Sequence, residues 1–304
     1  MDVHKNARTS VRWVVPAVVS LWLVSSSDVG AQPRSVATNW TAVAAPAELN
    51  TPGADWIKVE GRGHKLLAAV FRPRSEGPFP VVVLLHGAGG LQRSHLALGE
   101  DVARAGFLVI VGCWQFVASP PAPVPNAVCS EAPPQAQWQA DPAANSGKEL
   151  IAAARTLPGA RSDRVGVYGL SRGGNAALWA ASTGADVQAV VADAAAHLPL
   201  RVNPPPPSTQ QAVAGLAAPT LLLHGTADRV VPVEQTLEYE RAALALGKPV
   251  TAVYYEGVGH MATLTPPGAE PEAVAEARRV VQPEARRRAI GFLRQHLLGV
   301  SRSP

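Results

Sequence analysis

Short apolar runs alternate with helical patterns along most of the chain. Phe79–Leu85 is a continuous apolar run, which is typical of a strand buried on both faces. Similar runs predict strands at Phe107–Val111, Arg164–Tyr168, Val187–Ala192, Thr220–His224 and Val250–Tyr255. Helical patterns between and after them predict helices at Ser94–Ala105, Ser146–Leu157, Gly173–Ser182, Val233–Leu246 and Pro283–Leu298. Strands that alternate with helices favour a mostly parallel sheet with helices on both faces.

Two shorter runs precede this alternation. Trp56–Glu60 and Lys65–Phe71 are separated by Gly61-Arg62-Gly63, which predicts a β-hairpin. We therefore expect an α/β fold with about eight strands, of which the first two are antiparallel and the rest mostly parallel. No second domain and no large cap domain is expected, so residues 32–304 form a single domain in this interpretation.

The first residues have the features of an export signal. Basic side chains precede the apolar stretch Trp13–Val24, and the small residues Val29, Gly30 and Ala31 follow it. The apolar stretch is shorter than the roughly 20 residues that a membrane span needs. Residues 1–31 are therefore predicted to be a signal peptide of a secreted or periplasmic protein, without stable membrane insertion after cleavage. An uncleaved anchor is the alternative.

Composition narrows the possible partners. The chain has 27 Lys and Arg against 23 Asp and Glu, a net charge of +4, and 5% aromatic residues. Charge this thinly spread, with few aromatic rings to stack on bases, disfavours binding of nucleic acid. A hydrophobic share of 47% predicts a packed core. No sequence feature predicts an oligomeric state.

The chain contains two cysteines, Cys113 and Cys129. In an exported protein such a pair can persist as a disulfide, and closing a loop of about 16 residues stabilises by roughly 3 kcal/mol. Two buried free thiols are the alternative. Neither the cysteines nor the histidines have the spacing of a metal site, so we expect no metal.

A candidate nucleophile lies between a predicted strand and a predicted helix. Gly169-Leu170-Ser171-Arg172-Gly173 matches the pattern G-x-S-x-G, in which a strained turn exposes the serine at the carboxyl edge of the sheet. A serine hydroxyl needs a histidine base, and the base needs a carboxylate to orient it. The sequence thus predicts Ser171 as nucleophile and requires partners later in the chain.

Two residues in the required order supply those partners. Asp228 follows the strand Thr220–His224, and His260 follows the next strand, so both are expected at the same sheet edge as Ser171. Asp193 also follows a strand at this edge and is the alternative acid. Glu256 is too close in sequence to His260 to face it easily.

Acyl transfer also requires donors for the oxyanion. The segment His86-Gly87-Ala88-Gly89-Gly90 ends a buried strand, and we expect the N–H groups of Ala88 and Arg172 to form the oxyanion hole. A plain tight turn is the alternative, whereas a phosphate loop is disfavoured because Gly-Lys-Ser/Thr is missing. His86 and His224 each precede a glycine at a strand end and are expected to bind backbone groups. Trp114 and Gln115 are candidate walls of the substrate pocket, or ordinary core residues.

With Ser171, Asp228 and His260 in this order after the His86-Gly87 segment, the chain resembles an α/β-hydrolase over roughly residues 55–298. It looks most like the dienelactone-hydrolase-like and prolyl-oligopeptidase-like branches. Dienelactone hydrolases proper use a cysteine nucleophile, so Ser171 argues against that lactone activity and for a serine esterase. The resemblance implies hydrolysis of a small-molecule ester through an acyl-enzyme, without cofactor or metal.

Three points stay open at the level of sequence. The same triad cleaves amides, so a peptidase or amidase is an alternative to an esterase. A catalytically silent binding protein on the same fold is another. The stretch Pro266–Pro283, directly after the expected base, either shapes the entrance of the site or forms a surface excursion.

Overall fold

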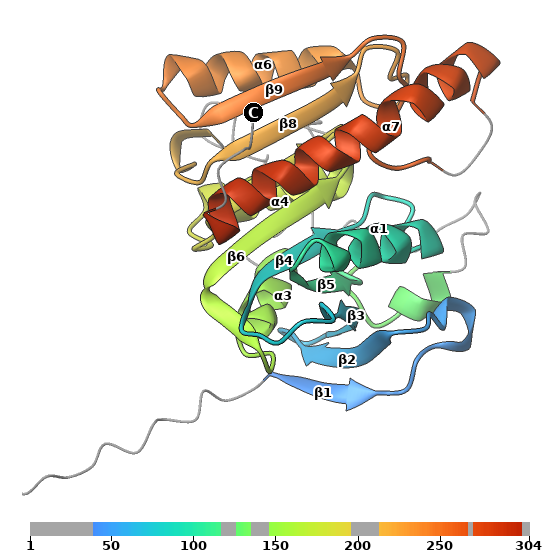
Figure 1. The fold of residues 1–304 in the computed structure, drawn as a ribbon, viewed down its shortest axis with the longest axis vertical. Helices are drawn as coiled ribbons and strands as arrows, with labels where there is room; N and C mark the ends of the chain where they lie inside the picture. The colour runs from blue at the N-terminus through green and yellow to red at the C-terminus, as the bar shows by residue number, and fades with distance from the viewer. Residues whose placement is uncertain (1–38, 117–125, 135–145, 196–212, 267–269, 300–304) are drawn as a thin grey trace, which may run out of the picture. The chain divides into compact units, whose positions relative to one another are not determined.

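A nine-stranded sheet runs through the chain in the computed structural model, which describes residues 39–116, 126–134, 146–195, 213–266 and 270–299 (Figure 1). The predicted signal peptide, residues 1–31, lies outside the described residues. The strands are β1 (Trp40–Val43), β2 (Ala54–Glu60), β3 (Lys65–Phe71), β4 (Phe79–Leu85), β5 (Leu108–Gly112), β6 (Ala160–Leu170), β7 (Ala189–Asp193), β8 (Thr220–Gly225) and β9 (Val250–Tyr255).

The strand order is β1-β2-β3-β5-β4-β6-β7-β8-β9. β1, β2, β3 and β5 pair antiparallel in succession, and every other neighbouring pair is parallel. The predicted hairpin and parallel sheet are confirmed. The expected strand number was one too low, because β1 is a four-residue edge strand without a continuous apolar run.

Helices cover both faces of the sheet, as predicted. Figure 1 shows α1 and α7 in front of the strands and α3 and α4 behind them. The α-helices are α1 (Arg93–Arg104), α3 (Ser146–Ala154), α4 (Arg172–Ser182), α6 (Val233–Ala245) and α7 (Glu272–Leu293). Short 3-10 helices span Ala47–Leu49 and Asn126–Cys129, and a π-helical turn, Arg294–Leu298, extends α7. Among the described helices, none is long and apolar enough to cross a membrane.

The start of the last helix differs most from the expectation. α7 begins at Glu272 and continues through Pro283, which we had expected to begin the last helix. Proline is most common in the first helical turn, so its presence inside a long helix misplaced the start. Much of the stretch Pro266–Pro283 is therefore the first half of α7 rather than a loop.

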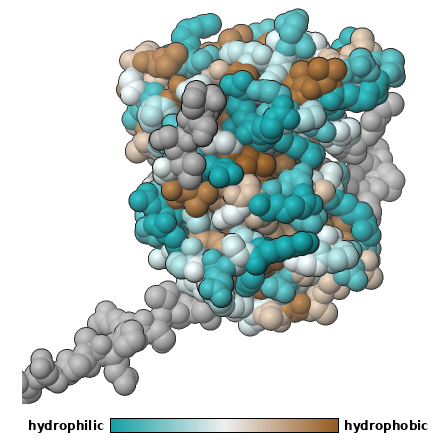
Figure 2. Space-filling model, in the orientation of Figure 1, coloured by the Kyte–Doolittle hydropathy of each residue, from teal (hydrophilic) through white to brown (hydrophobic). Residues whose placement is uncertain are grey.

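The central strands are buried on both faces because helices cover them. All residues of β5, β7 and β8 are buried, which explains their continuous apolar sequences. The face in Figure 2 is mainly hydrophilic, with hydrophobic side chains in small separate groups. The apolar residues thus stabilise one core around the sheet.

The order in which strands are added to the sheet reverses at β4, and this reversal determines where the site lies. β4 lies between β5 and β6, and the helices that follow β4 and β6 contact opposite faces of the sheet. In open α/β sheets, ligands bind in the crevice outside the carboxyl ends of the strands at such a switch point. The segments after β4 and β6 therefore face each other, and they carry Gly87 and Ser171.

Candidate active site

Ser171 occupies the turn between β6 and α4 in a strained backbone conformation. Its φ is 54° and its ψ is −117°, a combination that costs a non-glycine residue about 1–3 kcal/mol. Its N–H donates to the backbone carbonyl of Asp193 over 2.7 Å, which holds the turn against β7. A Cβ on Gly173 would overlap the backbone carbonyl of Leu85, so glycine is required for α4 to begin this close to β4.

Asp228 and His260 are brought together from two loops. Asp228 follows β8, His260 follows β9, and His260 Nδ1 lies 2.8 Å from Asp228 Oδ2. Because a carboxylate only accepts, Nδ1 carries the proton. That tautomer leaves Nε2 as the basic nitrogen of the ring.

Three further groups surround the Asp228 carboxylate, whose side chain is fully buried. Its Oδ1 accepts the N–H groups of Val230 and Val231 over 2.8 and 2.9 Å, and His224 Nε2 lies 3.2 Å from Oδ2. Burial alone raises the pKa of Asp228, but the hydrogen bonds from His224, His260 and Val231 outweigh it and hold the pKa well below its usual range. Asp228 is thus ionised at neutral pH.

The alternative acid, Asp193, has different partners. Its buried carboxylate accepts the N–H of Ala262 over 2.9 Å and the N–H and hydroxyl of Thr263 over 2.8 and 2.6 Å. Burial raises the pKa of Asp193, and these hydrogen bonds oppose that rise. Asp193 therefore binds Ser171 through its carbonyl and the segment after His260 through its carboxylate. This single residue brings the nucleophile turn and the base loop together.

The loop after β4 lies directly against Ser171. A Cβ built on Gly87 would be 3.3 Å from the Ser171 Cβ, so only glycine fits here without displacement. The Gly87 carbonyl accepts from His86 Nδ1 over 2.7 Å, from Gly90 N over 3.1 Å and from Gln115 Nε2 over 3.5 Å. Because a trans peptide directs its C=O and the next N–H to opposite sides, these contacts set the direction of the Ala88 N–H.

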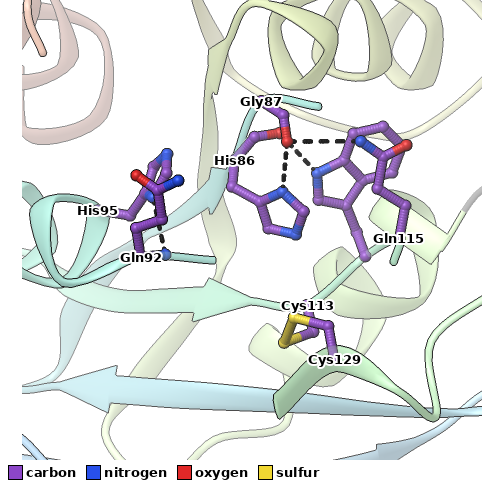
Figure 3. Close-up of a disulfide and its surroundings, with 8 residues drawn as sticks. His86, Gly87, Gln92, His95, Cys113, Gln115 and Cys129 are labelled. Carbon is purple, nitrogen blue, oxygen red and sulfur yellow. Dashed lines mark hydrogen bonds between the residues drawn. A yellow bond between two sulfur atoms is a disulfide. The ribbon is translucent and has the colours of Figure 1, made fainter. Parts of the chain in front are cut away.

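Figure 3 shows side chains that lie next to this loop. Trp114 and Gln115 are fully buried, and Trp114 Nε1 donates to the His86 carbonyl over 2.9 Å. Both side chains donate to carbonyls of the loop, Trp114 to His86 and Gln115 to Gly87, while a role as pocket walls stays a prediction. Cys113 and Cys129 form the predicted disulfide directly before these two residues.

His86 and His224 bind backbone carbonyls, as predicted. His86 binds Gly87, while His224 Nε2 lies 2.9 Å from the Val231 carbonyl and its Nδ1 lies 2.7 Å from the Thr236 hydroxyl. Burial lowers the pKa of His86 to about 4, and burial together with the nearby His86 lowers that of His95 to about 3. These two buried imidazoles are neutral at pH 7.

Sequence reasoning missed the contact of His224 with Asp228 and the role of two arginines of α7. Arg278 and Arg286 donate to backbone carbonyls of the loop after His260. In sequence they are two among several charged residues of this helix, and only the fold shows which side chains point inward. Within the described residues, no group of three His, Cys, Asp or Glu side chains is arranged to hold a metal ion.

Several known proteins resemble this chain. A probable 2-oxo-3-(5-oxofuran-2-ylidene)propanoate lactonase of Bradyrhizobium sp. is 27% identical over 213 residues, which cover 69% of this chain and 84% of the relative. A dienelactone hydrolase-like promiscuous phosphotriesterase from metagenomic libraries superposes with a TM-score of 0.58 at 16% identity, covering 85% of this chain and 99% of its own. Esterase 2 of Thermogutta terrifontis, in a structure phosphoramylated by tabun, gives a TM-score of 0.56 at 16% identity over 82% and 98% of the two chains.

These structural neighbours establish the α/β-hydrolase fold. Residues 66–296 match the model of the dienelactone hydrolase family, a span that contains the β4 loop, the Ser171 turn, Asp228 and His260. The chain is therefore a hydrolase that belongs to the dienelactone hydrolase family.

Proposed function

We propose that this protein is an exported serine hydrolase that cleaves carboxylic esters through an acyl-enzyme. The observation that carries the proposal is the partly buried Asp228–His260 pair, 2.8 Å apart, with the His260 loop joined through Asp193 to the strained Ser171 turn. A carboxylate, an imidazole with a free Nε2 and a serine at a strand-to-helix turn are the components that acyl transfer requires.

Each component has one task in the reaction. Ser171 Oγ attacks the ester carbonyl carbon while His260 Nε2 takes the hydroxyl proton. The carbonyl oxygen becomes an oxyanion, which the N–H groups of Ala88 and Arg172 stabilise. The imidazolium then gives its proton to the leaving alcohol, and the acyl group stays on Ser171. A water molecule then attacks the acyl carbonyl carbon while His260 Nε2 takes its proton. The imidazolium returns this proton to Ser171 Oγ, which releases the acid and restores the serine hydroxyl.

The environment of Asp228 suits the charge that this cycle creates. His260 becomes positive twice per turnover, and an ionised carboxylate on Nδ1 stabilises that cation and fixes the ring. Hydrogen bonds keep the Asp228 pKa low, so the carboxylate does not compete for the proton. His224 Nε2 lies 3.2 Å from the same carboxylate oxygen, Oδ2, and adds to this support.

The ester preference draws support from the relatives. A lactone is a cyclic ester, and both a lactonase and an esterase are among the similar proteins. Export draws support from the amino-terminal sequence and from the Cys113–Cys129 disulfide, since disulfides persist in oxidising compartments.

The test is hydrolysis of a p-nitrophenyl ester series, from acetate to decanoate, by the protein lacking residues 1–31. Ser171→Ala is expected to reduce turnover to background and to abolish labelling by a fluorophosphonate. Ser182→Ala, the same substitution at the far end of α4, is the matched control and is expected to keep both. Turnover that survives in Ser171→Ala contradicts the serine mechanism. Labelling without ester turnover favours an amidase or peptidase, and neither signal favours a binding protein.

A further inference from the structure

The loop that carries His260 is buried, although it has no regular secondary structure. Met261, Ala262, Thr263 and Leu264 are each at most 5% exposed. A buried loop cannot leave its backbone groups to water, so other parts of the protein must satisfy them. The partners of these groups therefore fix where the His260 backbone lies.

One side chain of α7, Arg278, satisfies three of the loop carbonyls. It is 3% exposed, and it donates to the carbonyls of His260 over 3.0 Å, of Leu264 over 3.1 Å and of Met261. Met261 has a φ of 63°, which is unfavourable for a residue with a Cβ. Arg278 thus holds both the residue that carries the imidazole and the strained residue after it.

Glu270 holds the guanidinium itself. Its carboxylate accepts from Arg278 Nε over 2.7 Å and from Arg278 Nη2 over 2.6 Å. Nη2 is the nitrogen that also donates to the His260 carbonyl. This two-point contact fixes the plane of the guanidinium and compensates a charge that would be costly to bury alone. The Arg278 guanidinium therefore contacts the loop in a fixed orientation, with its charge balanced by Glu270.

Other elements hold the remainder of the same loop. Asp193 binds the N–H groups of Ala262 and Thr263, and Arg286 Nε donates to the Thr263 carbonyl over 2.7 Å. Among the hydrogen bonds of the described residues, those of Asp193 and Arg286 reach Ala262 and Thr263, whereas those of Arg278 reach the carbonyls of His260 and Met261. Arg278 thus holds the carbonyl of the residue that carries the imidazole.

We propose that Arg278, oriented by Glu270, is a positioning residue that holds His260 in register with Ser171 and Asp228. This inference rests on the proposed function, because it gives His260 the role of the base. Misplacing a catalytic group by about 1 Å lowers the rate by about 100-fold, whereas substrate binding does not depend on it. Loss of Arg278 thus lowers kcat and leaves KM unchanged.

The first readout needs no substrate. The proton on His260 Nδ1, which is hydrogen-bonded to Asp228, gives a low-field proton resonance, and the absence of this resonance in His260→Ala assigns it. In Arg278→Gln this resonance is expected to broaden into exchange, because the ring no longer stays on Asp228. Arg279→Gln is the matched control: Arg279 is the next residue of α7, its side chain is 59% exposed and it pairs with Glu272 and Glu276. Its spectrum is expected to match the parent.

The second readout is the split of kcat and KM on p-nitrophenyl butyrate. Arg278→Gln is expected to lower kcat about 100-fold at unchanged KM, and Arg278→Lys, which keeps one donor, to recover part of it. If circular dichroism shows that Arg278→Gln does not fold, Glu270→Gln is the variant that tests the proposal. In Glu270→Gln we expect a broadened resonance and a loss in kcat of about tenfold. A sharp resonance and parental kcat in a folded variant with a lowered melting temperature overturn the proposal. A parent without esterase activity contradicts the proposed function only, since the resonance still reports on the positioning.

Discussion

The roles of the two buried aspartates of this site can be distinguished by one substitution at each residue. Asp228→Asn and Asp193→Asn are both nearly isosteric, and both remove a charge at the carboxyl edge of the sheet. The Asp228 carboxylate binds the His260 ring, whereas the Asp193 carboxylate accepts hydrogen bonds from the backbone of Ala262 and from the backbone and hydroxyl of Thr263. We expect the first change to act on catalysis and the second mainly on stability.

The contacts give the magnitude of each effect. In Asp193→Asn the amide oxygen keeps both Thr263 bonds, but these become neutral bonds and each loses about 1 kcal/mol. The amide NH2 then faces the buried Ala262 N–H, which is left unsatisfied at a cost of about 1–3 kcal/mol. Relief of the buried charge offsets part of this loss. The free energy of unfolding is expected to fall by about 3 kcal/mol.

The catalytic effects differ in size. Replacing the orienting carboxylate of a triad by an amide lowers kcat by about 10⁴-fold, because the histidine takes the wrong tautomer. We expect this loss for Asp228→Asn. For Asp193→Asn we expect a loss of no more than about 100-fold, the size that follows from a displaced base loop.

Urea unfolding followed by circular dichroism and kcat on p-nitrophenyl butyrate measure the two effects. Asp186→Asn, at a carboxylate with 81% of its side chain exposed, controls for the substitution itself. If Asp193→Asn lowers kcat by 10⁴-fold with unchanged stability while Asp228→Asn stays active, Asp193 is the triad acid and our reasoning is refuted.

Three further predictions follow from the loop after β4 and its supports. Reducing the Cys113–Cys129 disulfide, which closes a loop over a sequence separation of 16, is expected to lower the free energy of unfolding by about 3 kcal/mol; urea unfolding with and without reductant checks this, and an unchanged midpoint rejects it. The His86 pKa of about 4 lies below the value of 6.5 in the unfolded chain, so the unfolded state binds the proton more tightly and stability falls as the pH drops from 6.5 to 4. The loss is about 3 kcal/mol by pH 4, and unfolding curves of His86→Gln should lack this part of the slope. Gln115→Leu removes the 3.5 Å contact to the Gly87 carbonyl and a buried amide oxygen without a partner among the described residues. We expect kcat to fall less than about tenfold with stability unchanged within about 1 kcal/mol, and lost stability at parental kcat contradicts this.

Sequence patterns determined the fold class because burial leaves a direct trace in the order of residues. Strands covered on both faces read as continuous apolar runs, so β4 and the strands from β5 to β9 could be located from sequence alone. The turn at Ser171 could also be located, since glycines at fixed positions are required where a strand and a helix crowd together. The edge strand β1 left no such trace, because it is short and only partly buried.

Tertiary structure decided which charged side chains act at the site. Asp193 and Asp228 both follow strands at the same edge, and only the folded loops show that His260 meets Asp228 while Asp193 binds Ala262 and Thr263. Arg278 and Arg279 are neighbouring residues of the same type, yet Arg278 is buried against the base loop and Arg279 faces solvent. Hydrogen bonds between residues far apart in the chain depend on how helices pack on the sheet, and hydrophobic periodicity carries no record of those partners.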